Sequence, residues 1–112
     1  KYKGKKTRER KKILNEAILL QKEGVFSIVL ECIETSLAKE ISKSLDIPTI
    51  GIGSSKNCDG QVLVTDDLIG LNQTKIRFVK RFGNIKADIR NSISKFRKEV
   101  LHKKFPSKKY SY

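Results

Sequence analysis

The sequence predicts an α/β fold with parallel strands, because short apolar strands alternate with amphipathic helices along its 112 residues. Residues 25–30 form a nearly continuous apolar run rich in β-branched side chains, which is typical of a strand covered on both faces. Residues 49–52 and 61–64 are two further short strands. Three strands cannot close a barrel, so the pattern indicates either part of a barrel or the edge of an open doubly wound sheet.

Three helices are predicted from apolar side chains that recur at three- and four-residue spacing. The first covers residues 7–23 and ends at Gly24, the second has Thr35 or Ser36 as its N-cap, and the last covers residues 84–101. Their apolar stripes are Ile13, Leu14, Ala17, Ile18 and Leu20; Leu37, Ala38, Ile41 and Leu45; and Ile85, Ile89, Ile93, Phe96 and Val100. We also expect Phe26, Phe78 and Phe96 to be buried.

The formal net charge of +13 raises the possibility of a nucleic-acid partner. The positive charge gathers at the two ends, however, and the stretch between Glu31 and Thr74 is mildly acidic. Apolar runs are far shorter than a membrane span requires, and two isolated cysteines suit a reducing, cytoplasmic environment better than a disulfide scaffold. The sequence starts without methionine and contains none, so we expect it to continue a longer protein.

Glu31 is the first candidate for chemistry. It directly follows the apolar residues 28–30, at the end of a strand, where parallel α/β proteins carry their active sites. A carboxylate in apolar surroundings, shielded from water, is suited to act as a general base. The alternative is a structural glutamate that bonds a loop amide or a lysine, and position alone does not separate the two.

Other polar groups carry weaker signals. Residues 51–56 contain glycines and serines that could cradle a phosphate, although close packing of strand glycines explains the pattern better. Asp66 and Asp67 are expected to cap the following turn rather than bind metal. Cys32 and Cys58 have no partner at zinc-site spacing and are expected to be small, mostly buried apolar side chains.

Several segments together resemble the ketopantoate hydroxymethyltransferase family. They are Ile28-Val29-Leu30-Glu31-Cys32, Leu37-Ala38, Ile47-Pro48-Thr49-Ile50-Gly51-Ile52-Gly53 and Cys58-Asp59-Gly60-Gln61-Val62-Leu63-Val64. The resemblance continues through Asp67, Gly70-Leu71, Phe78-Val79-Lys80 and Glu99-Val100 to Phe105-Pro106, and upstream to Thr7. It covers essentially the whole chain.

The resemblance implies a (β/α)8 barrel, with residues 1–112 as the C-terminal part of a single barrel domain: its last three strands with their helices. The N-terminal part then lies outside this chain. The implied enzyme, 3-methyl-2-oxobutanoate hydroxymethyltransferase, moves a one-carbon unit from methylenetetrahydrofolate to 3-methyl-2-oxobutanoate, forming ketopantoate on the route to pantothenate and coenzyme A. The resemblance implies that Glu31 is the proton acceptor and that Gly53 and Ser54 belong to the pocket wall. It also implies Mg²⁺, with ligands in the N-terminal part and none in this chain.

The resemblance further implies a homo-oligomer, a decamer in the family, with a keto acid and a folate as small-molecule partners and neither nucleic acid nor membrane. Three departures stand out: Ile33-Glu34 replaces the usual Val-Pro, Ser54-Ser55 replaces Ala-Gly, and Asp66 replaces a histidine. We expect the chain alone to be inactive. A small basic nucleic-acid-binding module and an inactive barrel relic are the alternatives.

Overall fold

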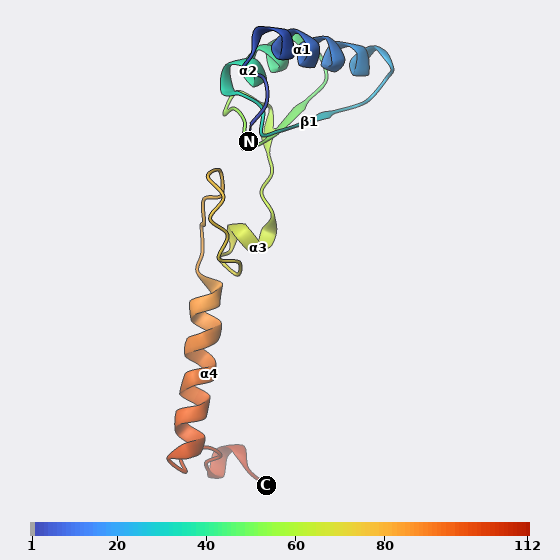
Figure 1. Ribbon diagram of the computed structural model, residues 1–112. Coiled ribbons are helices and arrows are strands. Elements are labelled where there is room, and N and C mark those ends of the chain that lie inside the picture. The colour runs from blue at the N-terminus through green and yellow to red at the C-terminus, as the bar shows by residue number, and fades with distance from the viewer. Residues whose placement is uncertain (1) are drawn as a thin grey trace. The chain divides into compact units, whose positions relative to one another are not determined.

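The computed structural model describes residues 2–112 and divides the chain into two compact units (Figure 1). The first unit comprises the chain up to Leu63 together with Ile76–Val79. The second comprises Val64–Lys75 and Lys80–Tyr112. The strand ends that carry the candidate site belong to the first unit.

The first unit alternates helices and strands. Its elements are α1 (Thr7–Lys22), β1 (Ile28–Glu31), α2 (Thr35–Ser44), β2 (Thr49–Ile52) and β3 (Gly60–Gln61). The strands form one parallel sheet in the order β1-β2-β3, as expected when each strand is followed by a crossover to its neighbour. The prediction of an α/β arrangement with parallel strands is confirmed.

A hydrophobic core lies between the two helices and one face of the sheet. Figure 1 shows α1 and α2 side by side on the same side of the strands. Leu30 of β1 faces these helices, and the four side chains predicted for the buried stripe of α2 are all in the core. The buried core side chains are Ala17, Leu30, Leu37, Ala38, Ile41, Leu45 and Cys58.

No helix among residues 2–112 covers the opposite face of the sheet. Successive side chains of a strand point to opposite faces, so Val29 and Glu31 face away from the side on which Leu30 is buried. Val29 is 59% exposed, and Phe26, just before the strand, is 90% exposed. The prediction that this strand and Phe26 are buried on both sides is therefore wrong for this chain, because its helices cover only one face.

The bounds of two strands also differ from the predicted ones. β1 begins at Ile28 rather than at residue 25, because its ladder starts where the partner strand starts, with Ile28 opposite Thr49. β3 is Gly60–Gln61 rather than the predicted residues 61–64. β2 has the predicted bounds.

The second unit contains α3 (Thr65–Leu68), α4 (Ile85–Leu101) and the short 3₁₀ helix η1 (Lys108–Tyr110). The helix predicted for residues 84–101 is confirmed, with Asn84 as its N-cap. Its apolar stripe is exposed, however, and Phe96 is 57% exposed where burial was predicted. No helix in the described part of the chain is long and apolar enough to cross a membrane.

Candidate functional site

The carboxyl ends of β1 and β2 lie next to each other. Glu31, the last residue of β1, pairs with Ile52, the last residue of β2. The Cys32 amide then donates a hydrogen bond of 2.9 Å to the Ile52 carbonyl, which holds the two strand ends together. The loops that follow the two strands therefore begin at the same edge of the sheet.

Glu31 lies at the predicted place, but its surroundings differ from the prediction. The side chain is exposed, because it belongs to the uncovered face of the sheet. Among residues 2–112 no hydrogen bond or ion pair to its carboxylate is found, neither from a loop amide nor from a lysine. The apolar shielding expected around Glu31 is not provided by this chain's helices, and its carboxylate is left available for other contacts.

The backbone turns sharply after Glu31. Cys32 has a φ of 52°, in the left-handed region that non-glycine residues rarely adopt. An N-terminal segment stabilises this turn, because the Lys3 amide donates to the Cys32 carbonyl at 2.9 Å and the Glu34 amide donates to the Lys3 carbonyl at 2.8 Å. The orientation of the chain leaving the candidate base is thus determined by residues far away in the sequence.

Ser54 links the loops after β1 and β2. Its hydroxyl donates to the Leu30 carbonyl at 2.5 Å and accepts from the Ile33 amide at 3.0 Å. The Thr35 hydroxyl donates to the Ser54 carbonyl at 3.3 Å. These two bonds of the Ser54 hydroxyl lie on either side of Glu31 in the sequence, and an alanine at position 54 could form neither of them.

Gly53 is in close contact with an aromatic side chain. Its φ is 61°, and a Cβ added there would lie 2.6–2.9 Å from atoms of Phe78. The segment Ile76–Val79, which belongs to the first unit, thus packs directly on the loop after β2.

Gly51 is also tightly packed, because a Cβ there would meet the Gln61 amide and the Cys58 sulfur. This contact explains Gly51 by packing, as predicted, rather than by phosphate binding.

A pocket of about 880 Å³ opens between these segments. We call it the strand-end pocket. Its lining residues come from the first unit and are Tyr2, Cys32, Ile33, Glu34, Thr35, Gly53, Ser54, Ser55, Lys56, Gln61, Ile76, Arg77 and Phe78. Gly53 and Ser54 line it, and Glu31 is not among the lining residues although the next residue is. Whether this pocket wall contacts substrate stays a prediction.

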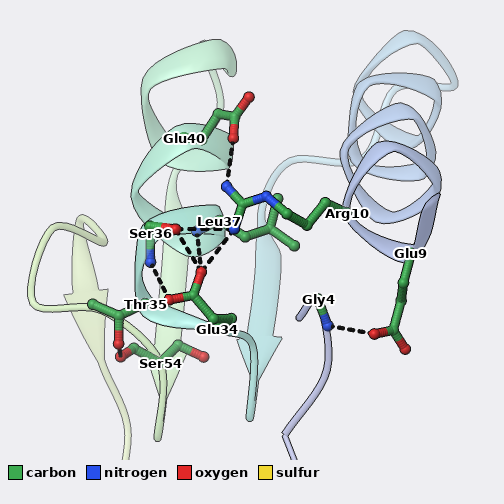
Figure 2. A network of polar contacts seen from close by, with 9 residues as sticks. All are labelled: Gly4, Glu9, Arg10, Glu34, Thr35, Ser36, Leu37, Glu40 and Ser54. Atoms are coloured by element: carbon green, nitrogen blue, oxygen red, sulfur yellow. Dashed lines mark hydrogen bonds and ion pairs between the residues drawn. The ribbon is translucent and has the colours of Figure 1, made fainter. Parts of the chain in front are cut away.

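Glu34 caps α2 and was missed by the sequence reasoning, which proposed Thr35 or Ser36. Its carboxylate accepts from the Ser36 and Leu37 amides, both at 3.1 Å, and from the Ser36 hydroxyl at 2.6 Å (Figure 2). The predicted caps were wrong because both residues already lie inside the helix, which begins at Thr35. Glutamate is not among the residues that usually cap helices, so no common pattern pointed to it.

Arg10 of α1 completes this network. Its guanidinium donates to the Glu34 carboxylate at 2.8 Å, to the Ser36 hydroxyl at 2.9 Å and to the Glu40 carboxylate at 2.9 Å. Figure 2 shows the guanidinium between α1 and the first turns of α2. Sequence reasoning missed Arg10 because it is one of many cationic residues near the N-terminus, and nothing local distinguishes it from its neighbours.

The hydrogen bonds to Glu34 favour its charged form. The Ser36 hydroxyl contributes most, followed by the Ser36 amide, and with the Leu37 amide and Arg10 they lower the pKa of Glu34 from the ordinary 4.5 to about 2, although burial acts in the opposite direction. A lowered pKa in the folded state means that the ionised group stabilises the fold. This contribution is complete above pH 4.5 and is lost as the pH falls toward 2.

We therefore expect the free energy of unfolding to fall as the pH is lowered from about 4.5 to about 2. The variant Glu34→Gln should show a smaller decrease over the same pH range, that is, a smaller slope of the free energy against pH. Urea unfolding followed by circular dichroism at several pH values measures both. Glu16→Gln, at an exposed position of α1, is the matched control and should keep the slope of the unchanged protein. Equal slopes for the Glu34 variant and the unchanged protein would contradict the assignment.

Asp59 holds the start of β2. It accepts from the Thr49 amide at 2.8 Å and from the Thr49 hydroxyl at 3.1 Å. These two hydrogen bonds lower the pKa of the Asp59 carboxyl. The Ser42 hydroxyl in turn contacts the Thr49 hydroxyl at 2.7 Å, which ties α2 to the same point. Asp59 therefore has a structural role.

The remaining polar candidates have structural surroundings. Asp67 is 7% exposed and accepts from Asn72 and Thr74, so it orders its own loop. It lies in the first turn of α3, whose N-cap is Val64, so the prediction that Asp66 and Asp67 cap this turn is wrong. Both cysteines are free thiols, Cys58 buried and Cys32 half-buried.

The described residues, 2–112, bring together few groups that could bind a metal. Among residues 2–112, no group of three or more histidine, cysteine, aspartate or glutamate side chains could hold a metal ion. Asp67 already accepts two hydrogen bonds, and Glu34 is bonded to Arg10. The residues present therefore do not fit Mg²⁺ on their own.

Comparison with known proteins agrees with the resemblance noted in the sequence. The family model described as ketopantoate hydroxymethyltransferase matches residues 1–108. A 3-methyl-2-oxobutanoate hydroxymethyltransferase of Pelagibacter ubique is 62% identical over 112 residues, which is 100% of this chain and 44% of that relative. Proteins of the same name from Clostridium botulinum and Thermosipho africanus are 47% and 50% identical and are covered over 41% of their length.

The chain thus spans less than half the length of these curated relatives. The family match nevertheless covers almost all of its residues, including both strand ends and the loops that follow them. The chain belongs to the ketopantoate hydroxymethyltransferase family.

Proposed function

We propose that this chain is the C-terminal part of a (β/α)8 barrel domain that transfers a hydroxymethyl group to 3-methyl-2-oxobutanoate, with Glu31 as the proton acceptor. Methylenetetrahydrofolate is the one-carbon donor and ketopantoate the product. One observation carries the proposal: in a chain of this family, Glu31 ends a strand of the parallel sheet, and among residues 2–112 its carboxylate has no hydrogen-bond or ion-pair partner.

The position suits a base that acts on a small substrate. In parallel barrels the reacting groups lie at the carboxyl ends of the strands, where the loops converge. Glu31 is at that end and on the face of the sheet away from α1 and α2, which is the inner face if the sheet is part of a barrel. The exposed side chain of Val29 lies on the same face and would supply apolar surroundings once that face is enclosed.

The proposed chemistry begins with a proton transfer. The carbon next to the keto group of 3-methyl-2-oxobutanoate loses its proton to the Glu31 carboxylate, leaving an enolate. Both C–N bonds of the donor's methylene bridge break: water adds its oxygen to the methylene carbon, and the two nitrogens take up the two protons of the water and leave as tetrahydrofolate. The enolate carbon bonds to the same carbon. The proton held by Glu31 then neutralises the new alkoxide, which becomes the hydroxyl group of the product. Because the residues present do not fit Mg²⁺, no step here is assigned to a metal.

Turnover is the direct test of this function. The full-length protein should form ketopantoate only when both the keto acid and methylenetetrahydrofolate are supplied, which mass spectrometry can follow. Binding of the keto acid without any product would favour an inactive relic of the barrel instead.

The isolated 112 residues are expected to show no turnover. The sheet face that carries Glu31 is open to water, because the helices of the first unit cover only the other face. Assay of the purified chain beside the full-length protein measures this. Product formation by the chain alone would show that these 112 residues contain a complete active site, which would contradict this expectation.

We also propose that the protein assembles as a homo-oligomer. The support is the exposed apolar stripe of α4, in which Ile89, Ile93 and Phe96 are 46%, 62% and 57% exposed. Ile93→Lys in the full-length protein should shift the assembly toward smaller species in sedimentation velocity, because a buried unpaired charge is unfavourable. Ser94→Lys, one residue away and off the stripe, is the control and should keep the original size.

A further inference from the structure

The strand-end pocket combines two cations with apolar walls. Lys56 and Arg77 are exposed lining residues on different segments, one after β2 and one in Ile76–Val79. No ion pair is formed by either of them among residues 2–112. The one carboxylate in the lining, Glu34, is already engaged by Arg10 at 2.8 Å. The pocket therefore carries excess positive charge and favours an anionic ligand.

The two serine hydroxyls of the pocket are already hydrogen-bonded within the protein. Ser54 uses its hydroxyl between the Leu30 carbonyl and the Ile33 amide. Ser55 is 3% exposed, and its hydroxyl bonds to the amide and side chain of Asn57. Recognition of an anion thus depends on Lys56 and Arg77 rather than on the serine pair.

The apolar part of the lining is contributed by Ile33, Ile76, Phe78 and Tyr2. Phe78 is held in place by its contact with Gly53, where an added Cβ would come within 2.6 Å of the ring. Aromatic rings favour flat, offset-stacked or edge-on contacts with other rings. A ligand with an aromatic portion beside its anionic groups therefore matches this wall.

The size of the pocket indicates which of the two substrates of the proposed function it fits. Both carry carboxylates, but the keto acid is a five-carbon molecule, whereas methylenetetrahydrofolate has an aromatic ring that leads to a glutamate tail. Pockets of roughly 300–1,000 Å³ typically enclose drug-sized ligands. A pocket of about 880 Å³ is far larger than the keto acid needs.

We propose that the strand-end pocket binds the aromatic ring and glutamate tail of the one-carbon donor, with Lys56 and Arg77 contacting the tail carboxylates. This inference rests on the proposed function. The lining includes Cys32, the residue after Glu31, so a donor bound here lies beside the immediate neighbour of the candidate base. The cations bind and orient the donor and take no part in the proton transfer.

The test uses the full-length protein with Lys56→Ala, Arg77→Ala and the double variant. KM is measured for methylenetetrahydrofolate with one and with three glutamates, and for the keto acid. The dissociation constant of tetrahydrofolate is measured by fluorescence quenching, and base function by deuterium exchange of the keto acid without donor. Lys39→Ala, at an exposed site of α2 outside the pocket, is the matched control.

We expect the double variant to raise the KM of the donor and the dissociation constant of tetrahydrofolate about tenfold, as loss of charge-assisted contacts in a partly exposed site implies. The effect should be larger for the triglutamate and smaller at high salt. The KM of the keto acid and its deuterium exchange should stay as in the unchanged protein, and Lys39→Ala should change none of these quantities.

Unchanged donor constants in the double variant would overturn the inference. A raised KM for the keto acid with an unchanged donor KM would overturn it too, because the pocket would then serve the smaller carboxylate. Failure of the proposed function gives a different result, namely no exchange and no transfer by the unchanged protein. The tetrahydrofolate dissociation constants then still decide: weaker binding in the double variant supports the pocket, and no binding by the unchanged protein overturns it.

Discussion

Glu31→Gln in the full-length protein is expected to lower hydroxymethyl transfer by about three orders of magnitude, within the range that general base catalysis contributes. Glutamine has nearly the same shape but cannot accept the proton. Glu31 is the end residue of β1, and none of the hydrogen bonds or ion pairs found among residues 2–112 involves its side chain. The substitution should therefore leave the fold and the binding of keto acid largely unchanged.

Deuterium exchange at the carbon next to the keto group is the sharper measurement, because it reports proton abstraction without the donor. The exchange rate should fall with the transfer rate, while calorimetry should show keto acid binding close to that of the unchanged protein. Glu23→Gln, at the exposed C-cap of α1, is the control and should affect neither quantity. Near-normal exchange in the Glu31 variant would remove this residue from the mechanism.

Gly53→Ala should produce the largest change in the pocket wall. The new Cβ would lie 2.6 Å from the Phe78 ring, and the φ of 61° is itself strained for alanine. Strain of this backbone conformation costs about 1–2 kcal/mol, and crowding of a packed contact adds about 1–3 kcal/mol. We expect the free energy of unfolding to fall by about 2–5 kcal/mol and the KM of the donor to rise as Phe78 is displaced.

Gly24→Ala separates the two contributions. Gly24 has a φ of 91° but no atom within 4 Å of the position that a Cβ would occupy, so alanine there adds backbone strain alone. Urea unfolding should show a loss of about 1–2 kcal/mol, and the KM of the donor should not change. Equal losses of stability for the two variants would mean that Phe78 moves away from Gly53 without penalty.

Much of the local structure follows directly from the residue pattern. The stripe of Leu37, Ala38, Ile41 and Leu45 is buried as its spacing predicts. The predicted bounds of β2 and of α4 are confirmed, because each coincides with a clear change from apolar periodicity to turn residues. The end of β1 at Glu31 was likewise readable from the sequence.

The surroundings of the site were not readable in this way. Ser54 bonds Leu30, and Arg10 bonds Glu34, each across 24 residues of sequence. Local periodicity carries no information about contacts at such separations, since they depend on how strands and helices pack. The burial predicted for Phe26 and Phe96 was wrong for a related reason: an apolar side chain shows that it favours burial, but not whether the chain has another element to cover it.

The sequence by itself determined the alternation of helices and parallel strands, the core stripe of α2, the family, and the position of Glu31 at a strand end. The helices, the strands, the stripe and the strand end depend on side-chain periodicity and on short-range turn chemistry, which are local properties of the sequence, whereas the family was identified from the resemblance of its motifs. Only the tertiary structure decided that the loops after β1 and β2 are joined by Ser54 and that Phe78 packs on Gly53 to form a cationic, aromatic pocket. These contacts depend on the parallel register of the strands, which brings distant segments to one edge of the sheet.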